Sequence, residues 1–571
     1  MKKKKISDVT SRIIVQGEGR DEWGNRYFKL AVSGSEIDLT PFPMGEISSN
    51  PERLYSALSN AGMNVFTRKV KNKLLELLQA RKQERHSFKV ATRLGWNSGA
   101  IVRPDEIIGA PKNTLERAFG NLDQQMLAKY RLRGTLEEWQ ANIVSLCTGN
   151  SRLIFALSLA FTGPILRFVR GPRGGGFQFW GPKETGKTTA VMVAGSVWGC
   201  HTGTGNREIA FAETWHTTAN EVEITALAHN DCLLILDETS LAGSDDRERA
   251  QVVINVTMRL AQLREKQRMT NVSPARSWRC YFLSTSNFTL DRLAQNGKVV
   301  LDDAHRSRLT DIPLPSGGKG IYDDLHGFVS GDKLTDALIV RCRKYYGTAG
   351  EEFQGQLVED RQRSIQQLRE SLSGWRTRYV RTLNAKAKAE RLKPLERSTG
   401  RCATVYAAGR LAIQYGILPW NRKQLLQAVL SCQLDGLQWA KAKHLETDTS
   451  VSGLRLKLVE YLRERCREFM DLDKERPRLG KHRFGSVPGY VATFKDKKWF
   501  YLTADQLAGT IGTGENADQL KKELAQAGML ASRANGKSLV QRPIFSGAKS
   551  NKGHKWVHAF RARLLKQQPQ D

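Results

Sequence analysis

One segment of the chain places glycine, lysine and threonine at the spacing of a phosphate-binding loop. It reads GPKETGKTT and fits the pattern glycine, four residues, then Gly-Lys-Ser/Thr. Such a loop wraps a polyphosphate, so that backbone N–H groups and the N-terminus of the next helix face it. The residues expected to bind nucleotide are Gly181, Pro182, Lys183, Glu184, Thr185, Gly186, Lys187, Thr188 and Thr189. Lys187 would reach the β- and γ-phosphates of ATP, and the Thr188 hydroxyl would hold Mg²⁺.

The residues around this loop favour the phosphate-binding interpretation. The apolar segment 176–180 predicts a short buried strand, and 190–194 predicts a helix that stops at Gly199. Strand, loop and helix is the context that the pattern needs. The alternative, an ordinary glycine turn before a helix, does not require that context.

Hydrolysis needs a group that holds the metal and a group that activates water, and a second apolar strand ends in two acids. The run 232–236 is followed directly by Asp237 and Glu238. Because parallel strands deliver such side chains to the carboxyl edge of a sheet, Asp237 is expected beside Thr188 as a Mg²⁺ ligand. Glu238 would polarise the attacking water as a general base. The alternative is two solvated acids that open a loop.

A third apolar strand, 278–283, ends in polar residues that could order water near the γ-phosphate. Asn287 is the best candidate, and Thr285 or Ser286 is the alternative. The same residues are also ordinary turn formers, so the pattern alone is weak.

Two arginines precede a further apolar strand. Arg306 or Arg308 could reach the γ-phosphate held by a neighbouring subunit, where a guanidinium stabilises the transition state of phosphoryl transfer. Either arginine could instead pair with Asp302 or Asp303.

The charge balance predicts a polyanionic partner. Among 571 residues, 89 Lys and Arg face 58 Asp and Glu, a net charge of +31. Nucleic acid is favoured over a membrane surface, because no basic amphipathic stretch with an aromatic anchor occurs. No apolar run is long enough to span a bilayer. The 8 cysteines are scattered without zinc-like spacing, which indicates reduced thiols in a cytoplasmic protein.

The chain length and the composition shifts divide the sequence into four regions. Residues 1–95 predict a small α+β domain, with strands at 12–15 and 27–32 and helices at 50–61 and 69–81. Residues 96–318 alternate apolar strands with helices, which is typical of an α/β layer with a largely parallel sheet. The third region, 319–460, predicts helix almost throughout, and 471–571 forms a separate small unit.

The last region predicts a winged helix. A strand at 498–502 leads into a capping box at Thr503, a helix follows, and a second helix runs over 516–527. Asn535-Gly536 then predicts a hairpin between 530–533 and 537–541. The residues expected to contact DNA phosphates are Lys521 and Lys522 on the second helix and Arg533, Lys537 and Arg542 on the wing. Subunit contacts are the alternative use of such a unit.

Several separate motifs together resemble a known family, the domain-of-unknown-function 927 family. The resemblance runs over roughly residues 10–440. The motifs that carry it are GTLEEW at 134–139, the phosphate loop with SVWG at 196–199, TWHTTAN at 214–220, HND at 229–231, FLST at 282–285, RLTDIP at 308–313 and YGILPW at 415–420.

This family is similar to the helicases of staphylococcal cassette elements, which are AAA+ ATPases related to the minichromosome maintenance helicases. The resemblance implies a ring, a hexamer in related proteins, whose active sites are completed by the adjacent subunit. Ser307-Arg308-Leu309 resembles the arginine finger of those proteins, which favours Arg308 over Arg306. Lys266 and Arg268 match a DNA-facing segment but lack its glycine. Arg397 and Arg401 are candidates for a second trans-acting arginine.

The sequence therefore predicts an AAA+ P-loop ATPase that uses ATP and Mg²⁺ and works as a DNA helicase or translocase. Replication of a mobile element, plasmid or prophage is the expected setting, with a primase or polymerase of that element as a candidate partner. Two alternatives stay open. The first is an ATP-regulated DNA-binding initiator without unwinding activity, and the second is an ATPase that remodels protein partners in phage defence.

Overall fold

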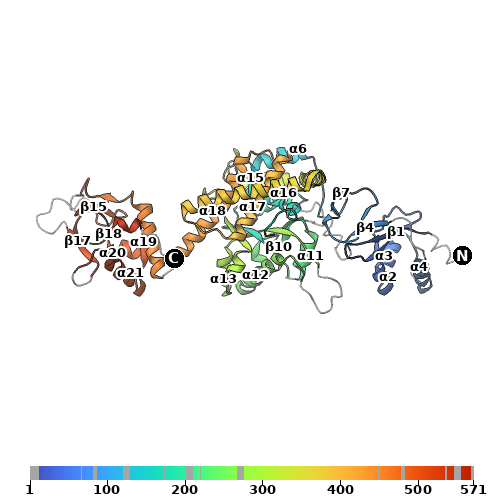
Figure 1. Ribbon diagram of the computed structural model, residues 1–571, viewed down its shortest axis with the longest axis horizontal. Helices are drawn as coiled ribbons and strands as arrows, with labels where there is room; N and C mark the ends of the chain where they lie inside the picture. The colour runs from blue at the N-terminus through green and yellow to red at the C-terminus, as the bar shows by residue number, and fades with distance from the viewer. Residues whose placement is uncertain are drawn as a thin grey trace. The chain divides into compact units, whose positions relative to one another are not determined.

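The computed structural model describes most of the chain, which forms two compact units. The units are Met1–Leu437 and Gln438–Asp571, and each is described by itself. Figure 1 labels their helices and strands. The described residues are 12–65, 67–80, 87–119, 129–172, 174–200, 210–218, 220–265, 276–447, 450–477, 483–533, 537–544 and 554–566.

The N-terminal region contains both strands and helices, as its sequence predicts. Its sheet has the order β3-β2-β1-β4-β8, and the strands are β1 (Ile13–Arg20), β2 (Arg26–Val32), β3 (Phe42–Pro43), β4 (Ser87–Ala91) and β8 (Leu115–Arg117). The helices are α2 (Met44–Ser49), α3 (Glu52–Asn60) and α4 (Arg68–Ala80). The helix predicted over 50–61 starts later, because Asn50 is the C-cap of α2 and Pro51 takes the N-cap position of α3.

A small antiparallel sheet follows, with β5 (Gly95–Asn97), β6 (Ala100–Val102) and β7 (Ile107–Ile108). Buried hydrogen bonds join the β5 strand to the segment before β11 (Cys232–Asp237) of the central sheet. The Trp96 N–H donates to Asp231 Oδ2 at 2.9 Å, and Asp231 also forms an ion pair with Arg279 at 2.8 Å. Asp231 therefore connects three segments that are distant in the sequence.

The central sheet of the first unit is wholly parallel. Its order is β10-β11-β12-β9-β13, and the strands are β9 (Gly176–Trp180), β10 (Glu213–Thr214), β11 (Cys232–Asp237), β12 (Cys280–Ser286) and β13 (Leu309–Pro313). Its three central strands are buried almost throughout. Burial on both faces explains why these strands are continuous apolar runs in the sequence.

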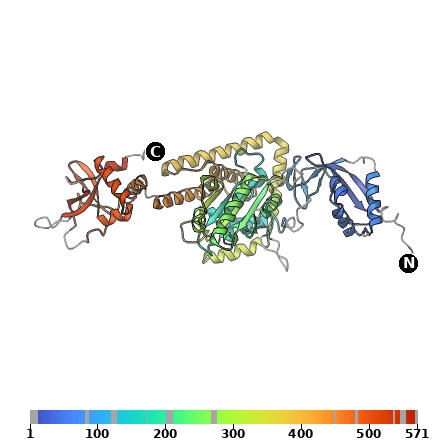
Figure 2. The same ribbon diagram turned by 90° about the horizontal axis from the view of Figure 1, so that it is seen from below.

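Helices cover both faces of this sheet (Figure 2). Alternate residues of each strand point to opposite faces, so Leu233 and Ile235 enter one core while Leu234 and Leu236 enter the other. The first core contains α8 (Ser151–Ala160), α9 (Thr162–Ile165), α10 (Lys187–Gly195) and α17 (Glu396–Gln414); the second contains α11 (Glu221–Ala228), α12 (Asp246–Gln262) and α13 (Leu290–Gly297). The remaining short helices are α6 (Leu136–Trp139), η1 (Gln140–Val144), α7 (Ser145–Cys147), η2 (Thr239–Leu241) and α14 (Asp303–Arg306).

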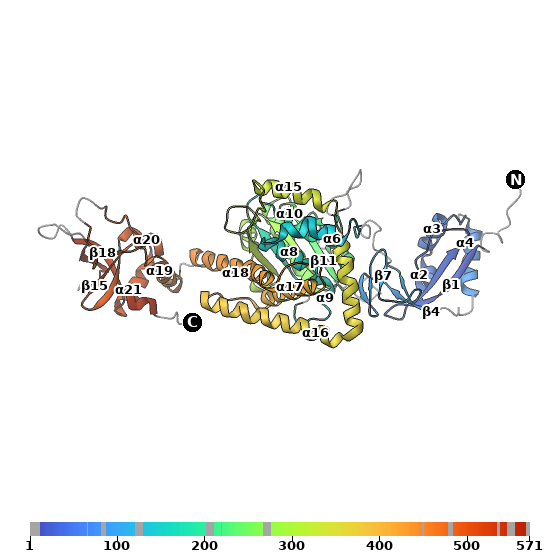
Figure 3. The same cartoon turned by 90° about the horizontal axis from the view of Figure 1, so that it is seen from above.

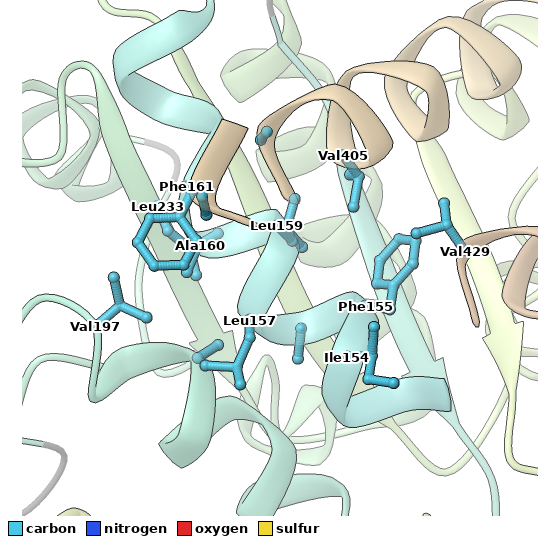
Figure 4. Close-up of a cluster of buried hydrophobic side chains, with 14 of the residues drawn as sticks. Ile154, Phe155, Leu157, Leu159, Ala160, Phe161, Val197, Leu233, Val405 and Val429 are labelled. Carbon is cyan, nitrogen blue, oxygen red and sulfur yellow. The ribbon is translucent and has the colours of Figure 1, made fainter. Parts of the chain in front are cut away.

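The region predicted as helical is helical from residue 331 onwards. It comprises α15 (Gly331–Cys342), α16 (Thr348–Glu390), α17 and α18 (Arg422–Thr447). Figure 3 shows α16 bending sharply, and the bend falls at Ser364, whose φ of −163° is not helical. Phe155 of α8 packs beside Val405 of α17 and Val429 of α18 (Figure 4), so one core extends across the predicted boundary at 318. That boundary stays a prediction.

The second unit has a five-stranded sheet with three helices packed on it. The sheet order is β14-β15-β16-β18-β17, and the strands are β14 (Met470–Asp471), β15 (Tyr490–Phe494), β16 (Lys497–Leu502), β17 (Leu539–Pro543) and β18 (His554–Arg561). The helices are α19 (Val451–Arg465), α20 (Ala504–Ile511) and α21 (Glu515–Gln526), with a last turn at η4 (Ala562–Lys566). The capping box at Thr503 and Gln506 is present as predicted.

The predicted hairpin is wrong in its strand pairing. β17 pairs antiparallel with β18, and the segment after α21 adds a bridge between Leu530 and Phe560 to the same edge. Across the predicted turn the described residues show one backbone hydrogen bond, from the Arg533 N–H to the Lys537 carbonyl at 3.0 Å, but no strand ladder. The physical reason is that the edge of β18 supplies hydrogen-bond partners to both segments, which local turn chemistry cannot predict. The predicted turn Asn535-Gly536 lies outside the described residues.

The close approach of α9 to β11 makes a stability prediction. A Cβ on Gly163 would lie 2.4 Å from the backbone nitrogen of Cys232, and neither backbone can move without disturbing the sheet. We expect Gly163→Ala to lower the free energy of unfolding by about 1–3 kcal/mol, measured by urea denaturation. The control is Gly355→Ala in α16, where a Cβ meets nothing within 4 Å. It should be neutral or slightly stabilising, and equal effects in both variants would contradict the packing argument.

Candidate nucleotide-binding and hydrolysis site

The predicted phosphate loop connects β9 to the N-terminus of α10. Two of its glycines have positive φ, 157° at Gly181 and 82° at Gly186, and Glu184 is also left-handed at 58°. Gly186 caps α10, so the first N–H groups of that helix are open to a ligand. A Cβ at Gly186 would lie 2.9 Å from the side chain of Ile321, so the loop also needs glycine there for packing.

Lys187 begins α10, and its ammonium group folds back onto the loop. Its Nζ donates to the carbonyl of Gly181 at 2.9 Å, to the carbonyl of Pro182 and to Oδ1 of Asn287 at 3.3 Å. The side chain is buried, and desolvation lowers the pKa of Lys187 although Asp237 and Glu238 oppose the shift. The ammonium therefore lies among neutral oxygen atoms that phosphate oxygens could replace.

Asp237 ends β11 and meets two hydroxyl groups. The Thr285 hydroxyl donates to Asp237 Oδ1 at 2.5 Å, and the Thr188 hydroxyl also hydrogen-bonds to this carboxylate. Desolvation raises the pKa of Asp237, and the two hydroxyl groups act in the opposite direction. One carboxylate and one hydroxyl fit Mg²⁺, which takes few protein oxygens and keeps several waters. The two residues predicted to bind the metal are thus adjacent.

Glu238 leaves the strand in a different direction from Asp237. Its φ of 61° is left-handed, a conformation uncommon for a residue with a side chain. The Glu238 N–H donates to the Thr285 hydroxyl at 3.0 Å, and its Oε1 accepts from Ser240 at 2.7 Å. The side chain is exposed, so this carboxylate is accessible to water. Backbone strain held by two hydrogen bonds is typical of functional sites.

The three candidates after β12 differ in how their side chains are used. Thr285 holds Asp237 and the amide of Glu238, and the Ser286 hydroxyl accepts from Thr239 at 2.7 Å. Both hydroxyl groups are therefore part of the scaffold. Asn287 places its amide beside Lys187, where it could contact a γ-phosphate or a water. The structure favours Asn287, as the sequence did.

Arg306 and Arg308 differ in their contacts. Arg306 forms ion pairs with Asp291 at 2.9 Å and with Asp303 at 3.1 Å. Arg308 donates to the carbonyl of Ala304 at 2.7 Å, its Nε is buried without a hydrogen-bond partner, and no carboxylate of the described residues lies within ion-pair distance. Desolvation and the charge of Arg397 lower the pKa of Arg308. The charge of Asp302 acts in the opposite direction, but Arg308 forms no ion pair among the described residues.

Arg401 and Arg397, the candidates for a second trans-acting arginine, have different environments. Arg401 is 1% exposed and donates to the Ser307 carbonyl and to Thr310 Oγ1, both at 2.8 Å. It therefore holds the chain on both sides of Arg308 and is not accessible to another subunit. Arg397 is exposed and near enough to Arg308 to influence its pKa. The structure favours Arg397 for contact with a neighbour.

Two residues that sequence reasoning missed position Asn287. Asp311 of β13 accepts from Gln178 Nε2 at 2.8 Å and from the Leu290 N–H at 3.0 Å. Gln178 also donates to the Phe288 carbonyl at 3.2 Å, so the pair fixes the chain immediately after Asn287. The sequence feature that could have identified them is a glutamine and an aspartate inside otherwise apolar strands, because buried polar groups need hydrogen-bond partners.

The predicted DNA contacts that the structure describes lie in the second unit. Lys266 and Arg268 lie outside the described residues. Lys521 and Lys522 lie on α21, and Arg533 and Lys537 lie between α21 and β17 in the second unit. Lys521 forms an ion pair with Asp518 at 2.8 Å, and the Lys522 side chain is exposed.

Residues 2–270 match a family model described as a domain of unknown function. The matched family model is DUF927, and it covers less than half of the chain. This match confirms the resemblance predicted from the motifs up to residue 270, and the motifs from 282 to 420 lie beyond it. No curated protein matches the chain.

Among solved structures, the chain is similar to one titled "SCCmec type IV Cch - active helicase". The TM-score is 0.52 at 15% identity, and the match covers 97% of this chain and 95% of the other. At that identity the likeness is one of fold, a mixed α/β protein with a helical region. Another match is titled "The A form apo structure of NrS-1 C terminal region-CTR", with a TM-score of 0.26, 10% identity, 72% of this chain and 89% of the other. Its TM-score is too low to support an argument. In the described residues, no helix is both long and apolar enough to cross a membrane.

Asp311 makes a pH prediction for this unit. Desolvation raises the pKa of Asp311 to about 7, whereas an aspartate in an unfolded chain titrates near 3.9. Between about pH 4 and 7 the unfolded state binds fewer protons, so this group's contribution to the free energy of unfolding falls as the pH rises. Asp311→Asn removes the titration, and we expect a flatter pH dependence between pH 5 and 7.5.

The measurement is urea denaturation of both proteins at the two pH values. Each unit of pKa shift corresponds to about 1.4 kcal/mol, so the slopes should differ measurably. Asp336→Asn is the control, because that aspartate is 66% exposed on α15. Identical slopes in the wild type and Asp311→Asn would contradict the assignment.

Proposed function

We propose that the protein is an ATP-driven DNA helicase or translocase that forms a ring, with an AAA+ P-loop core. One observation carries the proposal: five predicted residues from three strand ends meet at one edge of the parallel sheet. They are Lys187, Thr188, Asp237, Glu238 and Asn287. The strand order, with the phosphate loop after the strand next to the edge strand β13, supports an ATPase of this class.

Each residue has a distinct role in hydrolysis. Lys187 would exchange the carbonyl groups of Gly181 and Pro182 for phosphate oxygens, and Thr188 and Asp237 would hold Mg²⁺. The bound ion neutralises charge that develops on the phosphates. Glu238 accepts a proton from the attacking water, and Asn287 orients that water.

Arg308 serves the active site of another subunit. Leu309 pairs with Gly176 in the parallel ladder, so Arg308 is level with the residue before β9, six residues from Gly181. At about 3.3 Å per residue, the separation along the strands is about 20 Å, too far for Arg308 to reach its own nucleotide. A guanidinium that forms no ion pair among the described residues, at the opposite end of the sheet, suits a contact across a ring interface, and Arg397 would lie in the same interface.

The substrate of the motor is DNA. The net charge of +31 supports a polyanionic partner, and the second unit, a winged helix in this proposal, carries Lys521 and Lys522 on α21. The helicase likeness is one of fold, and it supports the same choice. Replication of a mobile element, in a cytoplasm and with a primase or polymerase of that element, is the setting we propose.

The first prediction tests the hydrolytic site. We expect Lys187→Ala to abolish ATP hydrolysis, because the phosphates lose their cation. Glu238→Gln should lower kcat by a factor on the order of 10²–10⁴ because the general base is removed. The measurement is phosphate release with and without single-stranded DNA. Lys333→Ala on α15, where the lysine is 64% exposed, is the control. Wild-type turnover in Glu238→Gln would remove Glu238 as the base, and a wild type that DNA does not stimulate would count against the helicase.

The second prediction tests the interface. Arg308→Ala alone should lower kcat by a factor on the order of 10³–10⁵. Mixing it with Glu238→Gln protein should restore part of the activity, because some interfaces then combine an intact Glu238 with an intact Arg308. The matched variant is Arg306→Ala, whose arginine pairs with Asp291 and Asp303, and it should stay active alone. Absence of rescue in the mixture would show that Arg308 does not act between subunits.

A further inference from the structure

Trp556 of β18 is a large aromatic side chain that the second unit leaves in contact with solvent. It is 45% exposed, and the guanidinium of Arg533 lies 3.7 Å from its ring centroid. A tryptophan contributes about 150–250 Å² of surface when buried, so exposing nearly half of one leaves a large apolar surface in contact with water. Singly exposed apolar side chains are common on protein surfaces, so the groups around Trp556 decide what it could bind.

The position of Trp556 is on the sheet face that carries the helices. Phe560 lies four residues along the same strand and packs in the core with α20 and α21, so Trp556 shares its face. Gln541 of β17 is directly opposite Trp556 in the antiparallel ladder. The tryptophan therefore lies on the wing formed by β17 and β18, beyond the helices on the same face.

Helix α21 brings positive charge to this face. His558 lies two residues from Trp556 on the same face, and burial together with the charge of Lys521 lowers its pKa to about 4. The Lys521 ammonium is thus near the strand that holds Trp556, and Lys522 on the same helix is exposed. An aromatic ring, a guanidinium and two ammonium groups complement a nucleotide, which has a π face and a phosphate.

Arg533 does not need the ring to hold its position. Its Nε donates to the Leu539 carbonyl at 2.6 Å, which already anchors the guanidinium to the start of β17. The contact with Trp556 is therefore additional to that anchor. An arginine fixed by the backbone and stacked on an exposed indole extends the planar surface available to a ligand.

We propose that Trp556 and Arg533 form a stacking platform for one unpaired DNA base. In this arrangement Lys521 and Lys522 contact the phosphates of the adjacent duplex, so the second unit recognises a junction between single and double strands. The inference rests on DNA being the partner in the proposed function and adds which part of the DNA this unit recognises. Stacking of a base on an aromatic side chain corresponds to about a 5- to 150-fold change in affinity.

The test uses the full chain and three DNA probes of identical duplex sequence. The first has a single-stranded tail with 2-aminopurine at the first unpaired position, the second has an abasic site there, and the third is blunt. Stacking quenches 2-aminopurine fluorescence, and anisotropy gives each affinity. The variants are Trp556→Leu, which keeps apolar bulk without a ring, and Trp556→Phe, which keeps a ring.

The control is Phe494→Ala. Phe494 is 44% exposed with Arg542 at 5.0 Å from its ring centroid, so it is chemically matched to Trp556. Strand register places it on the opposite face of the same sheet, because Val491 of β15 pairs with Phe500, which packs in the core shared with α20 and α21. It should therefore not contribute to the platform.

We expect Trp556→Leu to abolish quenching and to lower affinity for the tailed probe about tenfold, with less than a twofold change on blunt duplex. Trp556→Phe should keep most of the quenching and most of the affinity for the tailed probe, and Phe494→Ala should behave as the wild type. The wild type should bind the abasic probe as weakly as Trp556→Leu binds the tailed probe. Unchanged tailed binding in Trp556→Leu, or an equal loss on all three probes, would overturn the platform. If the wild type binds no probe at all, the DNA partner of the proposed function fails as well; if it binds and hydrolyses ATP on DNA while Trp556→Leu is unaffected, only the platform fails.

Discussion

The parallel ladder that joins β11, β12 and β9 is the constraint on which the candidate site depends. Leu236 pairs with Ser284, and Ser284 pairs with Gln178, so the three strands end at one level. Asp237 is consequently level with Thr285, and Asn287 follows the pair of Ser286 with Trp180, where the phosphate loop begins. A slip of one residue in either pairing would turn the side chains of that strand to the other face and separate these groups.

A second layer of buried polar contacts holds this edge in place. Thr285 joins the carboxylate of Asp237 to the amide of Glu238, and Gln178 with Asp311 fixes the segment after Asn287. Such groups are costly to bury without partners, and each here has one. Their geometry is therefore rigid, which is what an active site needs for orientation. The raised pKa of Asp311 is the electrostatic consequence of the same burial.

The end of the sheet away from the nucleotide loop is built differently. Arg401 is buried, and desolvation lowers its pKa to about 10. Its guanidinium donates hydrogen bonds to Ser307 and Thr310, on either side of Arg308. Arg308 itself has a buried, unpartnered Nε and forms no ion pair within the part of the chain that the structure describes. One arginine is thus used to position another, which is then available to a neighbouring molecule. The second unit also holds an arginine in place through the backbone, because the Leu539 carbonyl anchors Arg533 against Trp556.

The sequence by itself determined the elements with strong local signals. The strand at 176–180, the glycine turn and helix after it, the acids after 232–236 and the capping box at Thr503 follow from composition and spacing within a few residues, and all are present. Their chemistry is local, because a glycine-rich turn or a buried apolar run is specified by adjacent side chains. The motifs also identified the family that residues 2–270 match.

Only the tertiary structure decided which distant groups meet. It showed that Arg306 is held in ion pairs and that Arg401 is buried and so cannot contact a neighbour. It also showed that β17 pairs with β18 instead of with the segment after α21. It also revealed Gln178 and Asp311 as supports and Trp556 as an exposed ring. Each of these depends on contacts between segments far apart in the chain, and a local pattern contains no information about which partner a buried polar group or a strand edge will find.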